Sequence, residues 1–442
     1  MTKHQIDPRL FDDSDLSRHL LAARGTQWMR GNRGDPYALI LRDQGIEPRV
    51  LDVLYEGMRG LPPLRQSESD VWVTAGHEAG LAVLRDERLA PGEVVRAGGR
   101  ARRRKVFGID SGASLKHVLS VDDGLFGRDR AACGRLRDLA APVLGEQALA
   151  GRFDAARGLF DAGLAGVGGR FDLMADVVRG ATAAFLAELL GVEGEARARF
   201  AELAAGSGGA PDALLCPPTL AMARGLVESY DGLRELLDGL VDRGGAADGG
   251  DVVGGLLAAA GPDGAAREDV LAVLLLTVCV GAELAANLVC EGVRALWDHP
   301  DQWELLHEEP GLVAGAVEEL LRFVPPVRLI SRIATADTEV AGQPVERGHQ
   351  VVVLVDAANR DPEVFAEPER LRVGRRQAAR HLSLAEGTYA EVVAPVVRLL
   401  ARAALTSLTA GAWRGLRPAG EPVHRMRSPV VRGVARFPVA VG

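Results

Sequence analysis

The chain has 442 residues, of which 47% are hydrophobic and 25% charged, so it has the material for a large globular core. A formal net charge of −8 argues against a general nucleic-acid binder, and the N-terminus shows no apolar stretch typical of a secretory signal. The four cysteines, Cys133, Cys216, Cys279 and Cys290, are scattered without metal-ligand spacing. We therefore expect a soluble cytoplasmic protein without a metal site and without nucleic-acid or membrane partners.

Residues 1–60 are predicted to form an arm with short helices, followed by a single domain over residues 61–442. The arm has a loosely amphipathic pattern, in which a helical surface either docks a partner or folds back onto the domain. The pattern favours neither alternative. Its apolar positions are Leu16, Leu20, Leu21 and Trp28.

The next part of the chain is predicted to be mostly helical. The expected elements are a strand at residues 70–74, helices at 77–86, 122–145 and within 171–240, and Gly-rich connectors at 205–218 and 243–250. A basic run at residues 100–105 is interpreted as a solvated loop, with a phosphate- or partner-binding patch as the alternative.

Residues 267–300 are predicted to form one long core helix. The segment 270–276 is apolar on every face, so a helix there must be buried. The apolar run before Glu283 is too short to span a membrane, which favours a core helix in a large soluble domain. Polar residues then recur every three or four positions and share one face. They are Glu283, Asn287, Glu291, Arg294 and Asp298.

The C-terminal third adds a small β portion. A helix at residues 311–323 is followed by predicted strands at 328–334 and 349–355, and the tail from residue 428 is strand-like as well. The chain as a whole is therefore predicted to be mainly α with small accessory sheets, not an alternating βαβ fold.

An ordered series of landmarks in this third points to a family. Glu319 and Arg322 are three residues apart, on one face of the predicted helix, where a charged pair can meet. They are followed by Pro325-Pro326, Arg332, Asn359-Arg360-Asp361-Pro362, Phe365, Pro368 and Arg375. This succession resembles the cytochrome P450 superfamily of bacterial type and implies the P450 fold. Within that fold, Glu319 and Arg322 are expected to form a buried structural ion pair, joined by Arg375.

The haem-binding loop departs from the family's pattern. In P450s, a cysteine thiolate in a loop of the form Phe-Gly-x-Gly-x-His-x-Cys-x-Gly ligates the haem iron. The corresponding stretch, residues 381–395, has Glu391 at the cysteine position, Tyr389 at the histidine position and Val393 at the following glycine position. A carboxylate is a harder and weaker donor than a thiolate. Val393 also places a β-branched residue where the family's backbone passes close to the macrocycle.

Two further positions that serve haem in the family differ as well. The central helix of P450s carries an acid followed by Thr, but here Glu283 is followed by Leu284, which cannot relay a proton. The helix that offers His and Arg to the haem propionates keeps Arg137 but has Cys133 at the His position. We therefore predict a P450 fold that binds no haem, in which Glu283 is a solvated carboxylate of a vestigial pocket. That pocket is either filled by side chains or open.

A P450 homologue without the cysteine resembles the auxiliary proteins of nucleotide-deoxysugar glycosyltransferases in macrolide and anthracycline biosynthesis. The resemblance implies a non-catalytic protein that binds, stabilises and activates a glycosyltransferase, in a complex with two copies of each chain. Trp28, Trp72 and the arm's leucines are candidate interface anchors.

Two alternatives stay open. One is an enzyme: either a haem protein with Glu391 or Tyr389 as ligand, or a haem-independent catalyst that uses Glu283. The other is a carrier that holds a polyketide aglycone in the vacated pocket.

Overall fold

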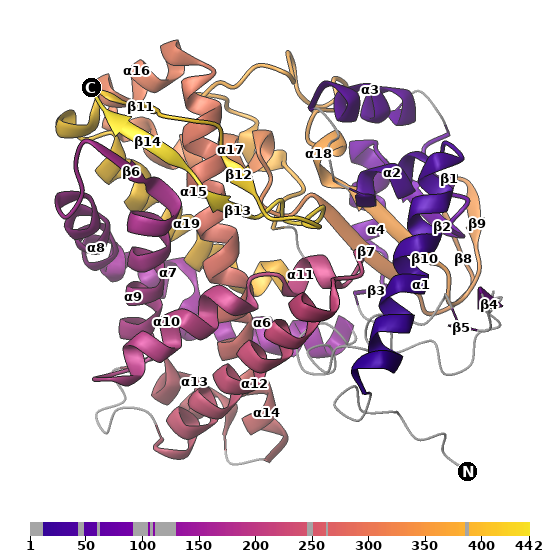
Figure 1. Ribbon diagram of the computed structural model, residues 1–442, viewed down its shortest axis with the longest axis horizontal. Helices are drawn as coiled ribbons and strands as arrows, with labels where there is room; N and C mark the ends of the chain where they lie inside the picture. Colours follow the sequence, from indigo (N-terminus) through magenta and orange to yellow (C-terminus); the bar gives the residue numbers. More distant parts are fainter. Residues whose placement is uncertain are drawn as a thin grey trace.

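The computed structural model describes residues 12–42, 48–59, 62–91, 105–106, 109–110, 130–244, 251–261, 264–384 and 389–442 (Figure 1). The predicted basic run at 100–105 lies outside these ranges except for Lys105. A sheet-containing part built around the N-terminal helices lies beside a larger helical part (Figure 1). The N-terminal helices are α1 (Asp13–Asn32), α2 (Pro36–Arg42), α3 (Pro48–Arg59) and α4 (His77–Arg85).

The main sheet joins strands from both ends of the chain in the order β1-β2-β10-β7-β3. Its centre is a parallel pair, β10 on β2, and the remaining pairs are antiparallel. The strands predicted at residues 70–74, 328–334 and 349–355 are therefore confirmed. The bounds are β1 (Arg65–Gln66), β2 (Val71–Thr74), β3 (Leu89–Ala90), β7 (Leu329–Ala334) and β10 (Gln350–Leu354).

Four smaller sheets are accessory to the fold. A three-stranded sheet has the order β11-β14-β6, and the other three are two-stranded ladders. Their strands are β4 (Lys105–Val106), β5 (Ile109–Asp110), β6 (Arg170–Asp172), β8 (Thr338–Val340), β9 (Gln343–Val345), β11 (Leu416–Pro418), β12 (Val423–His424), β13 (Val434–Arg436) and β14 (Pro438–Val441).

Helices make up most of the remaining described chain. The middle helices are α6 (Arg130–Leu144), α7 (Glu146–Leu149), α8 (Phe153–Ala165), the π-helical η4 (Leu173–Val178), α9 (Arg179–Leu189), α10 (Ala196–Ser207), α11 (Ala210–Ala213), α12 (Leu220–Asp242) and α13 (Val252–Ala260). The later ones are α14 (Gly264–Leu276), η5 (Thr277–Gly281), α15 (Ala282–Trp297), α16 (Pro300–Glu308), α17 (Val313–Phe323), α18 (Val355–Ala358) and α19 (Tyr389–Leu408). The predicted mainly α fold with small sheets is confirmed. The loop expected at residues 205–218 contains the short helix α11.

The predicted core helix is a continuous rod made of α14, η5 and α15. The η5 segment is π-helical, a widened turn inside the α-helix. By length and composition the span Arg267–Trp297 could cross a membrane, but 94% of its apolar window is buried inside the fold. The first part of its polar face is buried too, at Glu283, Asn287 and Glu291. The segment around β12 and β13 covers it, and Val434 N–H donates to Asn287 Oδ1 at 2.9 Å. This rod therefore serves as the central helix of the core.

Candidate functional site

The structure brings the predicted haem positions of three helices together. Glu391 and Val393 lie in the first turns of α19, Leu284 is on α15 and Cys133 is on α6. The helix α19 contacts η5, α15 and α6. Tyr389 begins α19, and its side chain lies outside the described part. These positions thus surround the place where the central helix meets α19.

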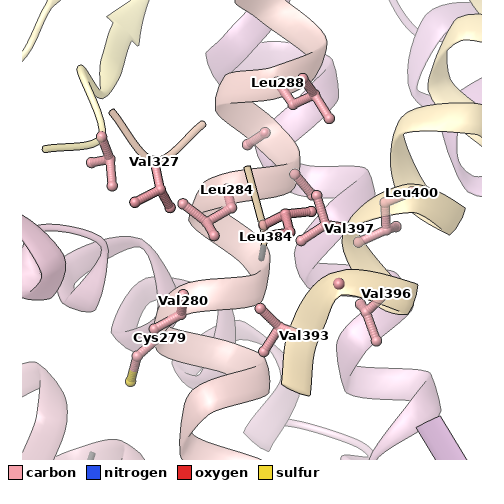
Figure 2. Close-up of a cluster of buried hydrophobic side chains, with 14 of the residues drawn as sticks. Cys279, Val280, Leu284, Leu288, Val327, Leu384, Val393, Val396, Val397 and Leu400 are labelled. Atoms are coloured by element: carbon pink, nitrogen blue, oxygen red, sulfur yellow. The ribbon is translucent and has the colours of Figure 1, made fainter. Parts of the chain in front are cut away.

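Apolar side chains fill this junction. In Figure 2, Val393 and Val397 of α19 extend toward the central helix, and Leu384 lies between the two helices. Val393 and Leu284 are fully buried. A Cβ atom built on Gly281 would lie 3.5 Å from the Cβ of Val393, which is ordinary van der Waals contact. The described helices therefore touch directly at this point.

The packing at this junction is close. A planar macrocycle needs about 3.5–4 Å to the carbon atoms on each of its faces, so side chains on opposite faces are about 7 Å apart or more. The Cβ of Val393 lies 3.5 Å from the position that a Cβ atom on Gly281 would take. At this point, the described side chains are packed as in a filled pocket.

The thiolate position and a propionate-binding position face each other. Glu391 Oε1 lies 3.8 Å from Nη1 of Arg137, and Arg137 also pairs with Asp138 at 2.9 Å. These side chains are partly exposed, and such pairs contribute little to stability. Cys133, at the third changed position, is half-buried and forms no disulfide with a described residue. The carboxylate at position 391 therefore has a cation as neighbour.

Glu283 is held by a buried ion pair, so the expectation of a solvated carboxylate is wrong. Its Oε1 accepts a hydrogen bond from Asn287 Nδ2 at 2.7 Å and lies 2.8 Å from Nη2 of Arg425. Arg425 follows β12, far from Glu283 in the sequence, and no sequence pattern linked the two. A carboxylate engaged in this way is poorly placed to act as a catalytic base.

Glu319 and Arg322 form a fully buried, bidentate pair. Arg322 Nε and Nη2 each donate to a carboxylate oxygen of Glu319 at 2.8 Å, and both side chains have no exposed area. Arg375 adds a third contact, with Nε 3.0 Å from both oxygens. The geometry is that of a structural charge network, since none of the described cavities opens onto it.

Asp212 was missed by the sequence analysis because it lies in the stretch expected to be a flexible connector. It is buried, and it accepts hydrogen bonds from Ser428 Oγ at 2.6 Å, Val430 N–H at 2.8 Å and Val431 N–H at 3.1 Å. Burial raises the pKa of Asp212 to about 6 despite these donors and the charge of Arg425. Within the described ranges, no group of three or more His, Cys, Asp or Glu side chains is placed to hold a metal ion.

Comparisons with known proteins agree with this architecture. The cytochrome P450 family model matches residues 293–381. The chain is 39% identical to Protein AknT of Streptomyces galilaeus, over 97% of this chain and 96% of that protein. It is 31% identical to the cytochrome P450 family protein EryCII of Saccharopolyspora erythraea, over 97% and 98% of the two chains.

This chain is also similar to a P450 monooxygenase and to a P450 of known crystal structure. The cytochrome P450 monooxygenase PikC of Streptomyces venezuelae is 30% identical over 78% of this chain and 79% of its own. The crystal structure of ligand-free CYP164A2 from Mycobacterium smegmatis superimposes with a TM-score of 0.77 at 25% identity, and covers 91% of this chain and 99% of its own. By sequence and by structure, this chain belongs to the cytochrome P450 family.

Proposed function

We propose that this chain is a haem-free P450 homologue that binds, stabilises and activates a glycosyltransferase of antibiotic biosynthesis. The observation that supports the proposal is the buried apolar packing of Val393, on α19, against the central helix at Gly281, where P450s of the family hold haem. The whole-length similarity to AknT and EryCII supports it, because the monooxygenase PikC matches a smaller part of the chain. The pathway is one of anthracycline or macrolide type, and the complex holds two copies of each chain in the cytoplasm.

The physical mechanism of activation is mass action. A partner that binds only the folded, competent glycosyltransferase shifts its population toward that state. The shift is RT ln(1 + [L]/Kd), about 2.7 kcal/mol at a hundredfold excess over Kd. No chemistry by this chain is required, which agrees with the ion-paired state of Glu283.

The two tryptophans predicted as anchors differ in accessibility. Trp28 on α1 is 55% exposed, and the guanidinium of Arg42 lies 5.8 Å from its ring centre. Trp72 lies in β2 with its indole nitrogen buried, so it is not free to reach a partner. Leu21, also on α1, is 61% exposed. The outer face of α1 is therefore the better candidate for docking.

Co-expression with candidate glycosyltransferases tests the proposal. We expect the two chains to co-purify, and the sugar-transfer rate to rise when this chain is present. Trp28→Ala should weaken the complex by about 1–2 kcal/mol if Trp28 anchors the interface. Arg157→Ala is the matched control, because Arg157 is exposed on α8, on the opposite side of the molecule (Figure 1). A transfer rate that is the same with and without the chain would overturn the proposal.

The haem-free state has its own test. The chain is expressed with supplied haem precursor, purified and examined for a Soret band, beside a P450 that is known to bind haem. We expect no Soret band, because Glu391 stands at the thiolate position and Val393 packs against the central helix beside it. A red protein with stoichiometric iron would favour the alternative of an enzyme with an unusual ligand.

A further inference from the structure

A charged cavity of about 370 Å³ lies beside the second half of the central helix. Most of its lining residues come from α3, α15, the segment after α17 and the segment around β12. Its size is at the lower end of the range for organic ligands. Four arginines line it, against three carboxylates. The charged lining residues are Arg294, Arg328, Arg360, Arg432, Glu291, Asp356, Glu421 and His424.

The two buried carboxylates of the cavity already have cations. Glu291 accepts from Arg294 Nε at 2.9 Å and lies 2.5 Å from Nε2 of His424. Asp356 accepts from Arg328 Nε, and Nη1 of Arg360 lies 3.5 Å away. Each acid is thus neutralised within the protein. The fourth arginine, Arg432, remains.

Arg432 has no hydrogen bond or ion pair for its guanidinium among the described residues. Burial, followed by the charge of Arg328, lowers the pKa of Arg432, while the carboxylates of Glu291 and Asp356 act in the opposite direction. The remaining acid, Glu421, is exposed at the cavity's edge. Arg432 is therefore the arginine of this cavity that makes no direct ion pair with a described residue, although Glu291 and Asp356 attract it from a longer distance.

The backbone holds Arg432 at the cavity wall. Its φ is +46°, in the left-handed region that non-glycine residues seldom adopt. Arg432 N–H donates to Ser428 O at 2.7 Å, while buried Asp212 accepts from Ser428 Oγ and from the backbone of Val430 and Val431. A turn anchored in this way gives Arg432 a defined place.

We propose that this cavity binds a small molecule that carries a phosphate or diphosphate group, with Arg432 as the main contact. An arginine offers a rigid fork of donors that matches two phosphate oxygens at once. The lining also has one more arginine than carboxylates, so an anion is favoured over a neutral ligand. The proposal is independent of partner binding, since it concerns the isolated chain.

Calorimetry and thermal unfolding of the purified full chain test this proposal. The probes are inorganic phosphate, pyrophosphate and glycerol 3-phosphate, with sodium acetate and sodium chloride at equal ionic strength as references. We expect at least one phosphate probe to bind saturably, with one site per chain, and to raise the Tm above both references.

Two variants make the result specific. Arg432→Gln should raise the Kd for the bound probe at least tenfold. Without a probe its Tm should equal or exceed that of the wild type, because a partly buried charge is removed. Arg436→Gln is the matched control, since Arg436 lies four residues away and its side chain is 70% exposed. It should bind like the wild type.

Three results would overturn the proposal. The first is a wild-type chain that no phosphate probe stabilises more than chloride does. The second is an Arg432→Gln variant that binds as tightly as the wild type. The third is acetate that binds as well as the phosphate probes, because the site would then not select for phosphate.

Discussion

Glu319 and Arg322 illustrate what a single buried side chain does in this fold. Besides pairing with Glu319, Arg322 donates from Nη1 to the carbonyl oxygens of Asn359 at 3.0 Å and Pro368 at 2.9 Å. Glu319 also accepts the backbone N–H of Arg372 at 2.9 Å. The pair therefore connects α17 to the segment that follows α18, through hydrogen bonds to the backbone of Asn359, Pro368 and Arg372.

Removing the acid of this network should be strongly destabilising. Glu319→Gln leaves the guanidinium groups of Arg322 and Arg375 buried without a full counter-charge, and we expect a loss of about 3–5 kcal/mol in the free energy of unfolding. Urea titration measures it. Glu367→Gln, at an exposed carboxylate that pairs with Arg370, is the control and should change stability far less, because solvent screens such a pair. A loss below 1 kcal/mol for Glu319→Gln would contradict the structural role.

Asp212 should impose a pH dependence of its own. Its folded pKa of about 6 lies above the ordinary value of 3.8, so folding favours the protonated form. The stability it contributes is complete below about pH 4 and is lost as the pH rises through 6. The Asp212→Asn variant has no carboxylate to ionise at this position, so its stability should not fall in this way as the pH rises. The unfolding free energy of the variant relative to the wild type should therefore rise between pH 4 and 6; a constant difference over that range would be evidence against it.

At the scale of elements, α19 packs directly against the central helix. Gly281 ends the widened η5 turn, and Val393 of α19 packs next to it. Thr277, at the start of the same turn, donates from Oγ1 to Val273 O at 2.8 Å and is fully buried. The hydroxyl of Thr277 is therefore satisfied within the helix.

Substitutions of two sizes at Gly281 can distinguish a filled junction from an open one. Gly281→Ala adds one methyl group at ordinary contact distance and should be neutral or stabilise by up to about 1 kcal/mol. Gly281→Leu should overpack the junction and destabilise by about 1–3 kcal/mol. Thermal and urea unfolding of both variants provide the measurement. If Gly281→Leu were as stable as Gly281→Ala, the junction would have to be open.

At the scale of the whole molecule, the N-terminal helices are part of the common core. Leu16 and Leu20 of α1 are buried in the same hydrophobic cluster as the central helix. Gln27 Nε2 donates to Leu215 O at 2.9 Å, and Tyr55 of α3 accepts from Arg328 Nη2 at 3.1 Å. The described helices of the arm therefore fold back onto the domain, while Leu21 and Trp28 of α1 are exposed.

Substitution of two adjacent leucines tests whether one face of α1 is packed in the core and the other is exposed. Leu20 is 2% exposed and Leu21 is 61% exposed. Leu20→Ala should lower the global unfolding free energy by about 2–5 kcal/mol, whereas Leu21→Ala should change it by less than about 0.5 kcal/mol. Equal, small effects on the main unfolding transition would indicate that α1 unfolds separately from the domain.

The sequence by itself determined the core helix, the central strands and the membership of the family. Each of these depends on a pattern within one contiguous segment: apolar faces over residues 270–276, apolar runs in the strands, and the ordered landmarks that begin at Glu319. Such patterns are local consequences of helix and strand periodicity. They predict an element and its buried face before any partner is known.

Only the tertiary structure decided which distant groups meet. Three contacts join residues that are about a hundred or more positions apart. Arg425 pairs with Glu283, Ser428 donates a hydrogen bond to Asp212, and Val393 packs next to Gly281. No periodicity relates such positions. Whether a buried carboxylate is solvated or ion-paired, and whether a vacated site is open or filled, depends on the packing of whole helices against one another.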